Sequence, residues 1–105
     1  MIEATQETRA GWLVVAVKGR ADAETADELE SALRSAVEQH SKVAADFRAL
    51  DYISSAGLRA VLQAVRAAQA KDREFAVCGM SESVKKVFDM SGMHHVLTIH
   101  AELPC

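Results

Sequence analysis

Hydrophobic and polar positions follow two different periods along this chain, and the switches between them mark its structural elements. Residues 2–8 and 12–19 contain two strand-like runs, separated by a short break that includes Gly11. This spacing predicts an antiparallel hairpin. Residues 12–17 are nearly all apolar, which is typical of a strand that is covered on both faces. We expect the second strand to end where residues 19–22 break the pattern.

A helical repeat follows this break, and the sequence offers two ways to start it. Asp22 could cap the helix directly; alternatively, Thr25 and Glu28 have the spacing of a capping box. The helix is expected to run to about Gln39. Its apolar stripe recurs every three or four residues and comprises Leu29, Ala32, Leu33, Ala36 and Val37.

A second strand–helix unit has two serines at the start of its helix. The strand is predicted over residues 43–47, and a short connection leads to a helix from about Ser55 to Ala70. Ser54 or Ser55 is well placed to cap the first free N–H groups of this helix. The predicted buried face comprises Leu58, Val61, Leu62 and Val65, and the other face comprises Arg59, Gln63 and Arg66.

The remaining sequence predicts a third unit of the same kind. Residues 74–78 have the pattern of a buried strand, Ser81 is expected to cap the helix that follows, and this helix should stop near residues 91–92. Residues 96–99 could add a last edge strand or a short extended segment. The apolar stripe of the third helix comprises Val84, Val87 and Phe88.

Several apolar side chains in this part of the chain are expected to serve packing. Phe88 should pack on the sheet, while Met90 and Met93 fill gaps near the helix end. The alternative is that these residues form a patch that faces a partner. Cys78 lies inside an apolar run and is interpreted as a small buried hydrophobic residue.

Strands that alternate with helices after an opening hairpin predict an α/β fold. We expect one domain, residues 1–105, with a mixed four- to five-stranded sheet. The sheet should have an N-terminal antiparallel hairpin and a parallel core, with about three to four helices packed against it. Loops that follow parallel strands meet at one rim of the sheet, and here those loops are residues 19–22, 51–55 and 79–81.

Composition supports a single compact domain and argues against several classes of protein. The chain has 105 residues, of which 50% are hydrophobic, which is enough for one core. Its net charge is −3, and its basic residues are scattered or paired with acids, so direct nucleic-acid binding is disfavoured. The sequence has neither a signal-peptide pattern nor an apolar run that could span a bilayer. We therefore expect a cytoplasmic protein without a membrane partner.

Candidate catalytic and metal-binding patterns are incomplete. His94, His95 and His100 lack a neighbouring Cys or carboxylate at ligand spacing, so no metal site is predicted. Ser55 follows a strand and precedes a helix, as the nucleophile of a serine hydrolase does, but Ile53 stands where that turn needs glycine. The five glycines occur singly, which argues against a phosphate-binding loop. We predict neither an enzyme nor a bound cofactor.

Three segments in one order resemble the STAS domain family, and within it the bacterial anti-sigma factor antagonists. They are residues 17–22 with the helix that follows, residues 46–58, and residues 84–93, which are similar to the C-terminal helix of that family. The resemblance covers almost the whole chain. It implies a single STAS domain that antagonises an anti-sigma factor by partner switching, in signal transduction that regulates transcription.

The resemblance also implies a partner and a phosphorylation site. In that family an anti-sigma factor that is also a serine kinase, of the histidine-kinase-like ATPase fold, phosphorylates the serine after the usual aspartate. Alignment on Gly57 puts the phosphoacceptor at Ser55, with Ser54 in place of the aspartate and Ala56 in place of a frequent serine. A phosphatase of the PP2C type would act on the phosphorylated Ser55. The implied partner-binding residues are Asp22, Asp51, Ser54, Ser55, Ala56, Gly57 and Arg59.

A second function stays open at this point. The chain could be a non-catalytic STAS adaptor that docks in a larger complex, such as a stressosome-like particle or a lipid-transport complex. In that case Ser55 would serve only as a helix cap. The two functions differ in whether a cognate kinase and ATP modify the protein.

Overall fold

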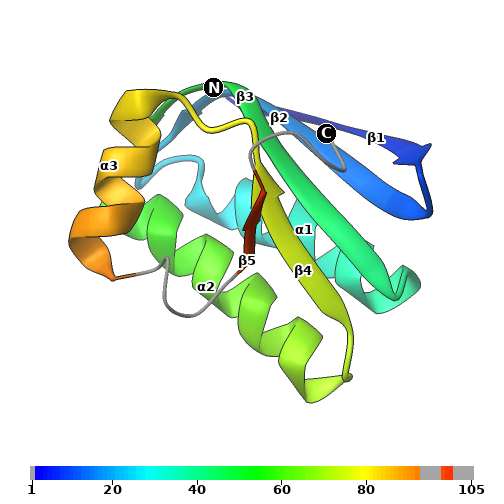
Figure 1. The fold of residues 1–105 in the computed structure, drawn as a ribbon. Coiled ribbons are helices and arrows are strands. Elements are labelled where there is room, and N and C mark those ends of the chain that lie inside the picture. Colours follow the sequence, from blue (N-terminus) through cyan, green and yellow to red (C-terminus); the bar gives the residue numbers. More distant parts are fainter. Residues whose placement is uncertain (1, 93–97, 101–105) are drawn as a thin grey trace.

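The sheet sets the position of every helix in the molecule (Figure 1). The computed structural model describes residues 2–92 and 98–100. Five strands lie in the order β1-β2-β3-β4-β5; β1 is antiparallel to β2, and the other neighbours are parallel. The strands are β1 (Ile2–Arg9), β2 (Trp12–Ala21), β3 (Lys42–Ile53), β4 (Glu74–Cys78) and β5 (Thr98–His100), and the helices are α1 (Ala26–Gln39), α2 (Ser55–Ala70) and α3 (Glu82–Ser91).

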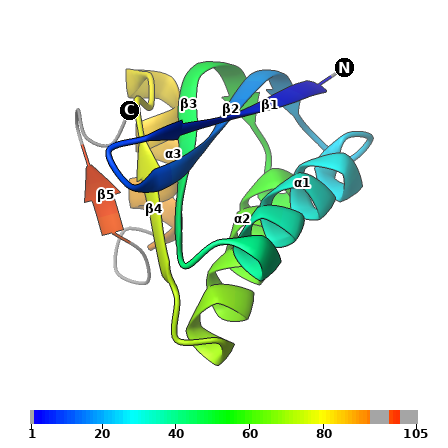
Figure 2. The same cartoon turned by 90° about the vertical axis from the view of Figure 1, so that its right-hand side faces the viewer.

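The three helices pack against one side of this sheet. Each parallel connection contains one of the described helices, and the strand order never reverses, so right-handed crossovers place α1, α2 and α3 on the same side. Figures 1 and 2 show α1 and α2 side by side along the sheet and α3 at its end. The predicted α/β fold, with its antiparallel hairpin, parallel core and helices, is confirmed.

β3 is much longer than the strand predicted over residues 43–47. Its pairing with β2 shifts register twice, so β3 has extra residues opposite its neighbour, as at a β-bulge. From Phe47 onward, the buried residues Leu50 and Ile53 come every third residue instead of every second. The alternation that identifies a strand is therefore lost, and a prediction based on it ends the strand too early.

β2 likewise continues beyond Gly19, where the pattern was expected to end it, and pairs with β3 as far as Ala21. Its apolar part is buried on both faces, as predicted. Val15 belongs to the main core, while Val14 joins a smaller cluster on the other face of the sheet. Cys78 is fully buried in that second cluster, which confirms its expected position.

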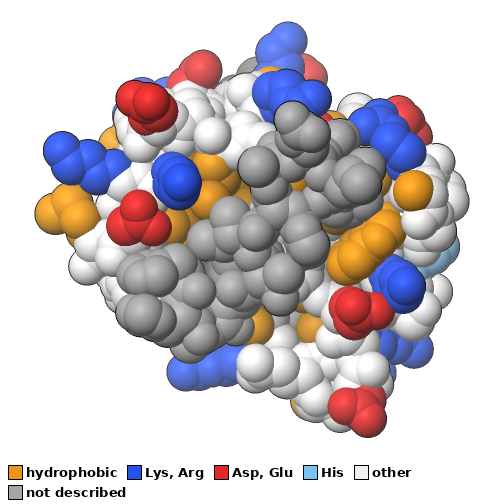
Figure 3. All heavy atoms as spheres, in the orientation of Figure 1, with side chains coloured by type: hydrophobic (Ala, Val, Ile, Leu, Met, Phe, Trp, Pro, Cys, Tyr) orange, Lys and Arg blue, Asp and Glu red, His pale blue; other side chains and the backbone are white. Residues whose placement is uncertain are grey.

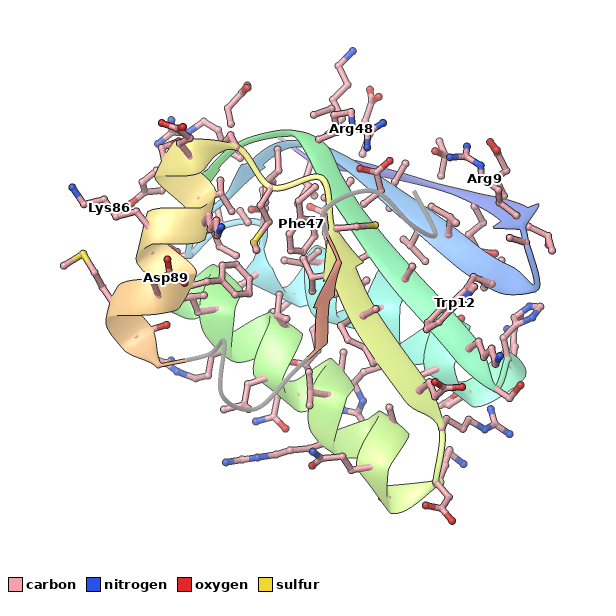
Figure 4. The ribbon with its side chains drawn as sticks, in the orientation of Figure 1. Arg9, Trp12, Phe47, Arg48, Lys86 and Asp89 are labelled. Atoms are coloured by element: carbon pink, nitrogen blue, oxygen red, sulfur yellow. The ribbon has the colours of Figure 1, made fainter. Side chains whose placement is uncertain are left out.

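The main core lies between the sheet and the helices, and Phe88 closes it at α3. Phe88 is fully buried, and its ring centroid lies 6.2 Å from that of Phe47 on β3. Figure 4 shows Phe47 between the sheet and α3. Met90, by contrast, is 80% exposed, so the prediction that it fills a gap is wrong. Met93 and residues 96 and 97 lie outside the described residues.

The predicted ends of α3 are confirmed. Ser81 accepts a hydrogen bond from the Val84 N–H group, 3.3 Å, and Gly92 ends the helix with a left-handed φ of 78°. The predicted last strand is present as β5, which pairs with β4. These elements agree with the caps and the apolar stripe read from the sequence.

Two findings concern membranes and metals. None of the described helices is long and apolar enough to cross a membrane. Within residues 2–92 and 98–100, no three His, Cys, Asp or Glu side chains form a group that could hold a metal ion. His94, His95 and the side chain of His100 lie outside the described part of the chain.

Replacing Phe88 should destabilise the fold strongly. The substitution Phe88→Ala removes a fully buried ring that packs against Phe47, and it should lower the free energy of unfolding by about 3–5 kcal/mol. Met90→Ala is the matched control on the same helix, because its side chain is exposed, and it should change stability by less than about 0.5 kcal/mol. Urea unfolding of both variants tests this. Equal losses would contradict the assigned packing of α3.

Candidate functional site

The ends of β2 and β3 are bound to each other at one rim of the sheet. Ala21 and Ile53 are paired neighbours at these ends. The Ser54 N–H group donates a hydrogen bond to the Ala21 carbonyl oxygen over 2.8 Å. The connections that follow the two strands therefore emerge side by side, which confirms that the first two predicted loops meet. We call residues 20–25 and 51–59 the rim.

The third loop predicted for the rim lies elsewhere. β4 ends at Cys78, which is paired with Asp46 in the first half of β3. Gly79 then lies against Asp46, so closely that an added Cβ atom would be 2.7 Å from Asp46 Oδ1. β3 continues well beyond this point, to Ile53. The prediction that residues 79–81 join the other two loops is therefore wrong, because β4 is much shorter than β3.

Ser54 and Ser55 have different structural roles. Ser54 has extended backbone, with φ −95° and ψ 177°, and its Oγ accepts a hydrogen bond from the Gly57 N–H group over 3.3 Å. Ser54 is therefore the N-cap of α2. Ser55 is the first residue of the helix and is exposed, and its hydroxyl makes no hydrogen bond within the described residues. Of the two candidate caps, the structure selects Ser54.

Gly57 lets α2 begin directly on the end of β2. A Cβ atom at Gly57 would lie 2.8 Å from Ile53 Cγ1, 2.9 Å from the Ala21 carbonyl oxygen and 3.0 Å from Ala21 Cβ. That carbonyl oxygen is also held by the Ser54 N–H group, so it cannot easily move aside. Gly57 is buried and positions the helix start, and its expected contribution to partner binding is therefore indirect.

Asp22 organises the turn between β2 and α1. Its Oδ1 accepts hydrogen bonds from the N–H groups of Glu24, 3.0 Å, and Thr25, 3.2 Å. Its carbonyl oxygen accepts from the Ala26 N–H group, 2.9 Å. Thr25 occupies the N-cap position of α1 without a side-chain cap, and its hydroxyl instead donates to the Arg20 carbonyl oxygen over 2.7 Å. Of the two alternatives for the start of this helix, the capping box of Thr25 and Glu28 is therefore wrong, because the Thr25 hydroxyl is used within the turn.

These hydrogen bonds change the acidity of Asp22. Partial desolvation raises the pKa of the carboxyl group, but the hydrogen bonds from Glu24 and Thr25 favour the charged form. The net result is a pKa below the ordinary value. Asp22 is half-buried, so its charge remains accessible at the rim while its Oδ1 holds the turn.

The other predicted partner-binding residues also lie on or beside the rim. Asp51 is exposed near the end of β3, and Arg59 is exposed on α2. Ala56 and Arg59 line a shallow groove between α1 and α2, whose opposite wall includes Asp27 and Glu30. The structure therefore places all seven predicted residues in one region.

Two side chains of the rim were not singled out from the sequence. Arg20 and Tyr52 are paired neighbours on β2 and β3, and the Arg20 guanidinium carbon lies 4.4 Å from the centroid of the Tyr52 ring. Tyr52 is 41% exposed, and with Met90 it is one of two large hydrophobic side chains that are exposed among the described residues. The sequence predicts a connection after residue 47, whereas β3 continues to Ile53, so no strand pairing between Arg20 and Tyr52 is expected from the sequence.

Surface charge around the molecule is mixed. Figure 3 shows Lys and Arg side chains next to Asp and Glu around the margin of the face seen in Figure 1. This pattern differs from the positive stripe that is typical of nucleic-acid-binding proteins. The electrostatics of the rim therefore depend on individual residues such as Arg20, Asp22 and Arg59.

Comparison with known sequences gives consistent matches. A family model described as "STAS domain" matches residues 1–104 of the chain. A protein of Bordetella bronchiseptica named "Putative anti-sigma factor antagonist BtrV" is 32% identical over 90 residues. These residues cover 85% of this chain and 78% of BtrV.

Solved structures share the same fold. An anti-sigma factor antagonist from Mycobacterium paratuberculosis superimposes with a TM-score of 0.88 and 23% identity, over 98% of this chain and 88% of that chain. Bacillus SpoIIAA in its phosphorylated form superimposes with a TM-score of 0.68 and 21% identity, over 97% of this chain and 93% of that chain. At these identities the likeness is one of fold.

Adding a single carbon atom at Gly57 should destabilise the rim. Gly57→Ala forces Ile53 or the Ala21 carbonyl to move, and it should lower the free energy of unfolding by about 1–3 kcal/mol, despite the better helix propensity of alanine. Ser55→Ala, two residues earlier on an exposed position, is the control and should change stability by less than about 0.5 kcal/mol. Thermal and urea unfolding measure both. If Gly57→Ala had the same free energy of unfolding as the parent, the close contact of Gly57 with Ile53 and the Ala21 carbonyl oxygen would be refuted.

The lowered pKa of Asp22 predicts a pH-dependent contribution to stability. Because the folded state favours the charged carboxylate, this contribution is present above the ordinary aspartate pKa of about 4 and is lost as pH falls through the lower folded value. Asp22→Asn keeps the accepting oxygen but removes the charge. This variant should have a slightly lower free energy of unfolding than the parent at pH 7. The difference between the two free energies should disappear below about pH 4.

Urea unfolding at pH 7 and pH 3 checks this prediction, with Asp51→Asn as a control for the loss of one exposed negative charge. The prediction would be contradicted if the difference in free energy of unfolding between the parent and Asp22→Asn were the same at both pH values.

Proposed function

Because the chain belongs to the STAS domain family, we propose that it is an anti-sigma factor antagonist whose rim binds an anti-sigma factor and is switched off by phosphorylation of Ser55. The name of its relative BtrV supports this proposal. The observation that carries it is the division of roles between the two serines. Ser54 caps α2, so the exposed hydroxyl of Ser55 can be modified without loss of the cap.

A phosphate on Ser55 is compatible with the folded domain. Phosphorylation adds about −1.5 to −2 charges, and the first turn of a helix favours negative charge through its dipole and its free N–H groups. Ser55 is the first residue of α2 and is exposed, so the phosphate need not displace a packed side chain. The switch therefore acts on binding and leaves the fold intact.

The proposed switch works by changing the cost of forming the interface. A neutral hydroxyl packed against a partner becomes a dianion that must be desolvated or is repelled. A weakening of about 3 kcal/mol corresponds to a loss of about 10²-fold in affinity. A change of this size is sufficient to release one partner in favour of another.

The partner inferred for the rim is an anti-sigma factor that is also a serine kinase of the histidine-kinase-like ATPase fold. A phosphatase of the PP2C type would reverse the modification, and both would act in the cytoplasm. The binding residues of this proposal are Asp22, Asp51, Ser54, Ser55, Ala56 and Arg59, with Gly57 positioning the helix start. The proposed activity is binding, and no catalytic step is assigned to the chain.

The alternative is an adaptor without a phosphorylation switch. That function explains Ser55 only as a helix cap, and in the structure the cap is Ser54. The structure thus removes the one role that the adaptor function gave to Ser55. The exposed hydroxyl of Ser55 is accounted for by the phosphorylation switch, and we therefore favour the switch.

Variants of the two serines should separate their roles. With the cognate kinase and ATP, the parent and Ser54→Ala should each gain one phosphate, while Ser55→Ala gains none and binds the kinase constitutively. Ser54→Ala should lose about 1 kcal/mol of stability through its cap, and Ser55→Ala much less. Ser55→Glu should bind the kinase more weakly than the parent at nearly unchanged thermal stability.

Intact-mass spectrometry and titration calorimetry measure these outcomes. Phosphate incorporated into Ser55→Ala but not into Ser54→Ala would assign the modification to Ser54. A parent protein that gains no phosphate from any cognate kinase, and that binds its partner as Ser55→Glu does, would favour the adaptor.

A further inference from the structure

The Arg20–Tyr52 pair belongs to the rim, but it is not among the binding residues of the proposed function. Both side chains are exposed, whereas the next residue on each strand, Ala21 and Ile53, is buried in the core. On β2, Val17 and Ala21 face the main core and Val14 faces the other side, so alternation directs Arg20 away from the main core. Tyr52 is paired with Arg20 and lies under its guanidinium group, so it is on the same face. They therefore extend the rim onto the face that the described helices leave uncovered.

The position of Arg20 is fixed from two directions. Its carbonyl oxygen accepts the Thr25 hydroxyl over 2.7 Å, and the next carbonyl, that of Ala21, accepts the Ser54 N–H group over 2.8 Å. At the other end of the side chain, the guanidinium group lies over the Tyr52 ring at 4.4 Å. Both the base and the charged end of Arg20 are thereby held in place.

The N–H edge of this guanidinium group is available to a ligand. Arg9 pairs with Glu7 and Arg34 with Glu30, but Arg20 makes no side-chain hydrogen bond or ion pair within residues 2–92. Stacking on an aromatic ring occupies the flat face of the group and leaves its N–H donors free. These donors match the two oxygens of a carboxylate.

We propose that Arg20, oriented by Tyr52, binds a carboxylate side chain of the anti-sigma factor at the edge of the proposed interface. Arg and Tyr residues are enriched among the residues that dominate binding energy, and a side chain that is already ordered loses less entropy on binding. Within the proposed function, Arg20 is a residue that determines partner choice, since it selects a partner with an acidic group at this position.

A phosphate on Ser55 is the other negative group that could approach Arg20. Ser55 begins α2, which packs on the main core side of the sheet, whereas the Arg20 side chain points to the opposite face. The geometry therefore favours a carboxylate supplied by the partner. The experiment below includes the phosphate as an outcome that would overturn the proposal.

The test measures binding of the unphosphorylated protein to its purified anti-sigma factor at two salt concentrations. Arg20→Ala should weaken binding about tenfold or more and reduce its salt dependence, because a charge-assisted contact is lost. Arg20→Lys keeps the charge but not the planar fork and should recover only part of the affinity. Tyr52→Phe keeps the ring and should bind like the parent.

Arg9→Ala is the matched control, since Arg9 is another exposed arginine but lies at the hairpin end of the sheet (Figure 4). Binding of Arg20→Ala with the affinity and salt dependence of Arg9→Ala would overturn the proposal. The proposal would also be overturned if Arg20→Ala affected only the phosphorylated protein. In that case the ³¹P spectrum of phosphorylated Arg20→Ala would show a raised pKa of the phosphate group, and Arg20 would be assigned to the phosphate.

The proposal rests on the proposed function, and Ser55→Glu separates the two. If Ser55→Glu weakens binding and Arg20→Ala does not, the role of Arg20 fails while the function stands. If neither variant affects binding, or the parent does not bind an anti-sigma factor, the proposed interface fails as well.

Discussion

The hydrogen bond from the Ser54 N–H group to the Ala21 carbonyl oxygen joins the two strand ends on which the site depends. Gly57 packs against the same carbonyl, so one backbone group fixes the end of β2, the end of β3 and the start of α2. Rigid backbone elements position functional side chains more accurately than loops do. The exposed Ser55 hydroxyl and the half-buried Asp22 carboxylate therefore have defined positions relative to each other before any partner arrives.

Much of this architecture could be predicted from the sequence, because most elements obey a simple period. α2 begins and ends where its apolar stripe and its serines indicate, and α3 has the predicted caps. The length of β3 could not be predicted, because its register shifts put Phe47, Leu50 and Ile53 on one face at a spacing of three. The capping box at Thr25 failed for a different reason: its hydroxyl bonds to the Arg20 carbonyl oxygen, a tertiary contact that local spacing does not report.

The candidate site was predictable in its residue types but not in its geometry. The sequence placed two serines at a helix start, and only coordinates distinguish the cap, Ser54, from the exposed neighbour, Ser55. The Arg20–Tyr52 contact could not be predicted from the sequence for a related reason. Neighbours across two parallel strands are far apart in sequence, and the extra residues in β3 decide which side chains meet.

The order of the strands also bears on how such a chain folds. Every strand from β2 onward pairs with the strand that precedes it along the chain, so no position in the sheet waits for a segment synthesised later. Each pairing therefore joins segments that are close in sequence, separated by one turn or one helix, which keeps the entropy cost of closing each connection low. The contacts that join β2, β3 and α2 involve Ala21, Ser54 and Gly57 alone, but the core beneath them also contains Phe75 of β4 and Phe88 of α3. The rim is therefore stabilised by elements that follow it in the chain, and a destabilising change in α3 reaches the binding surface through the shared core.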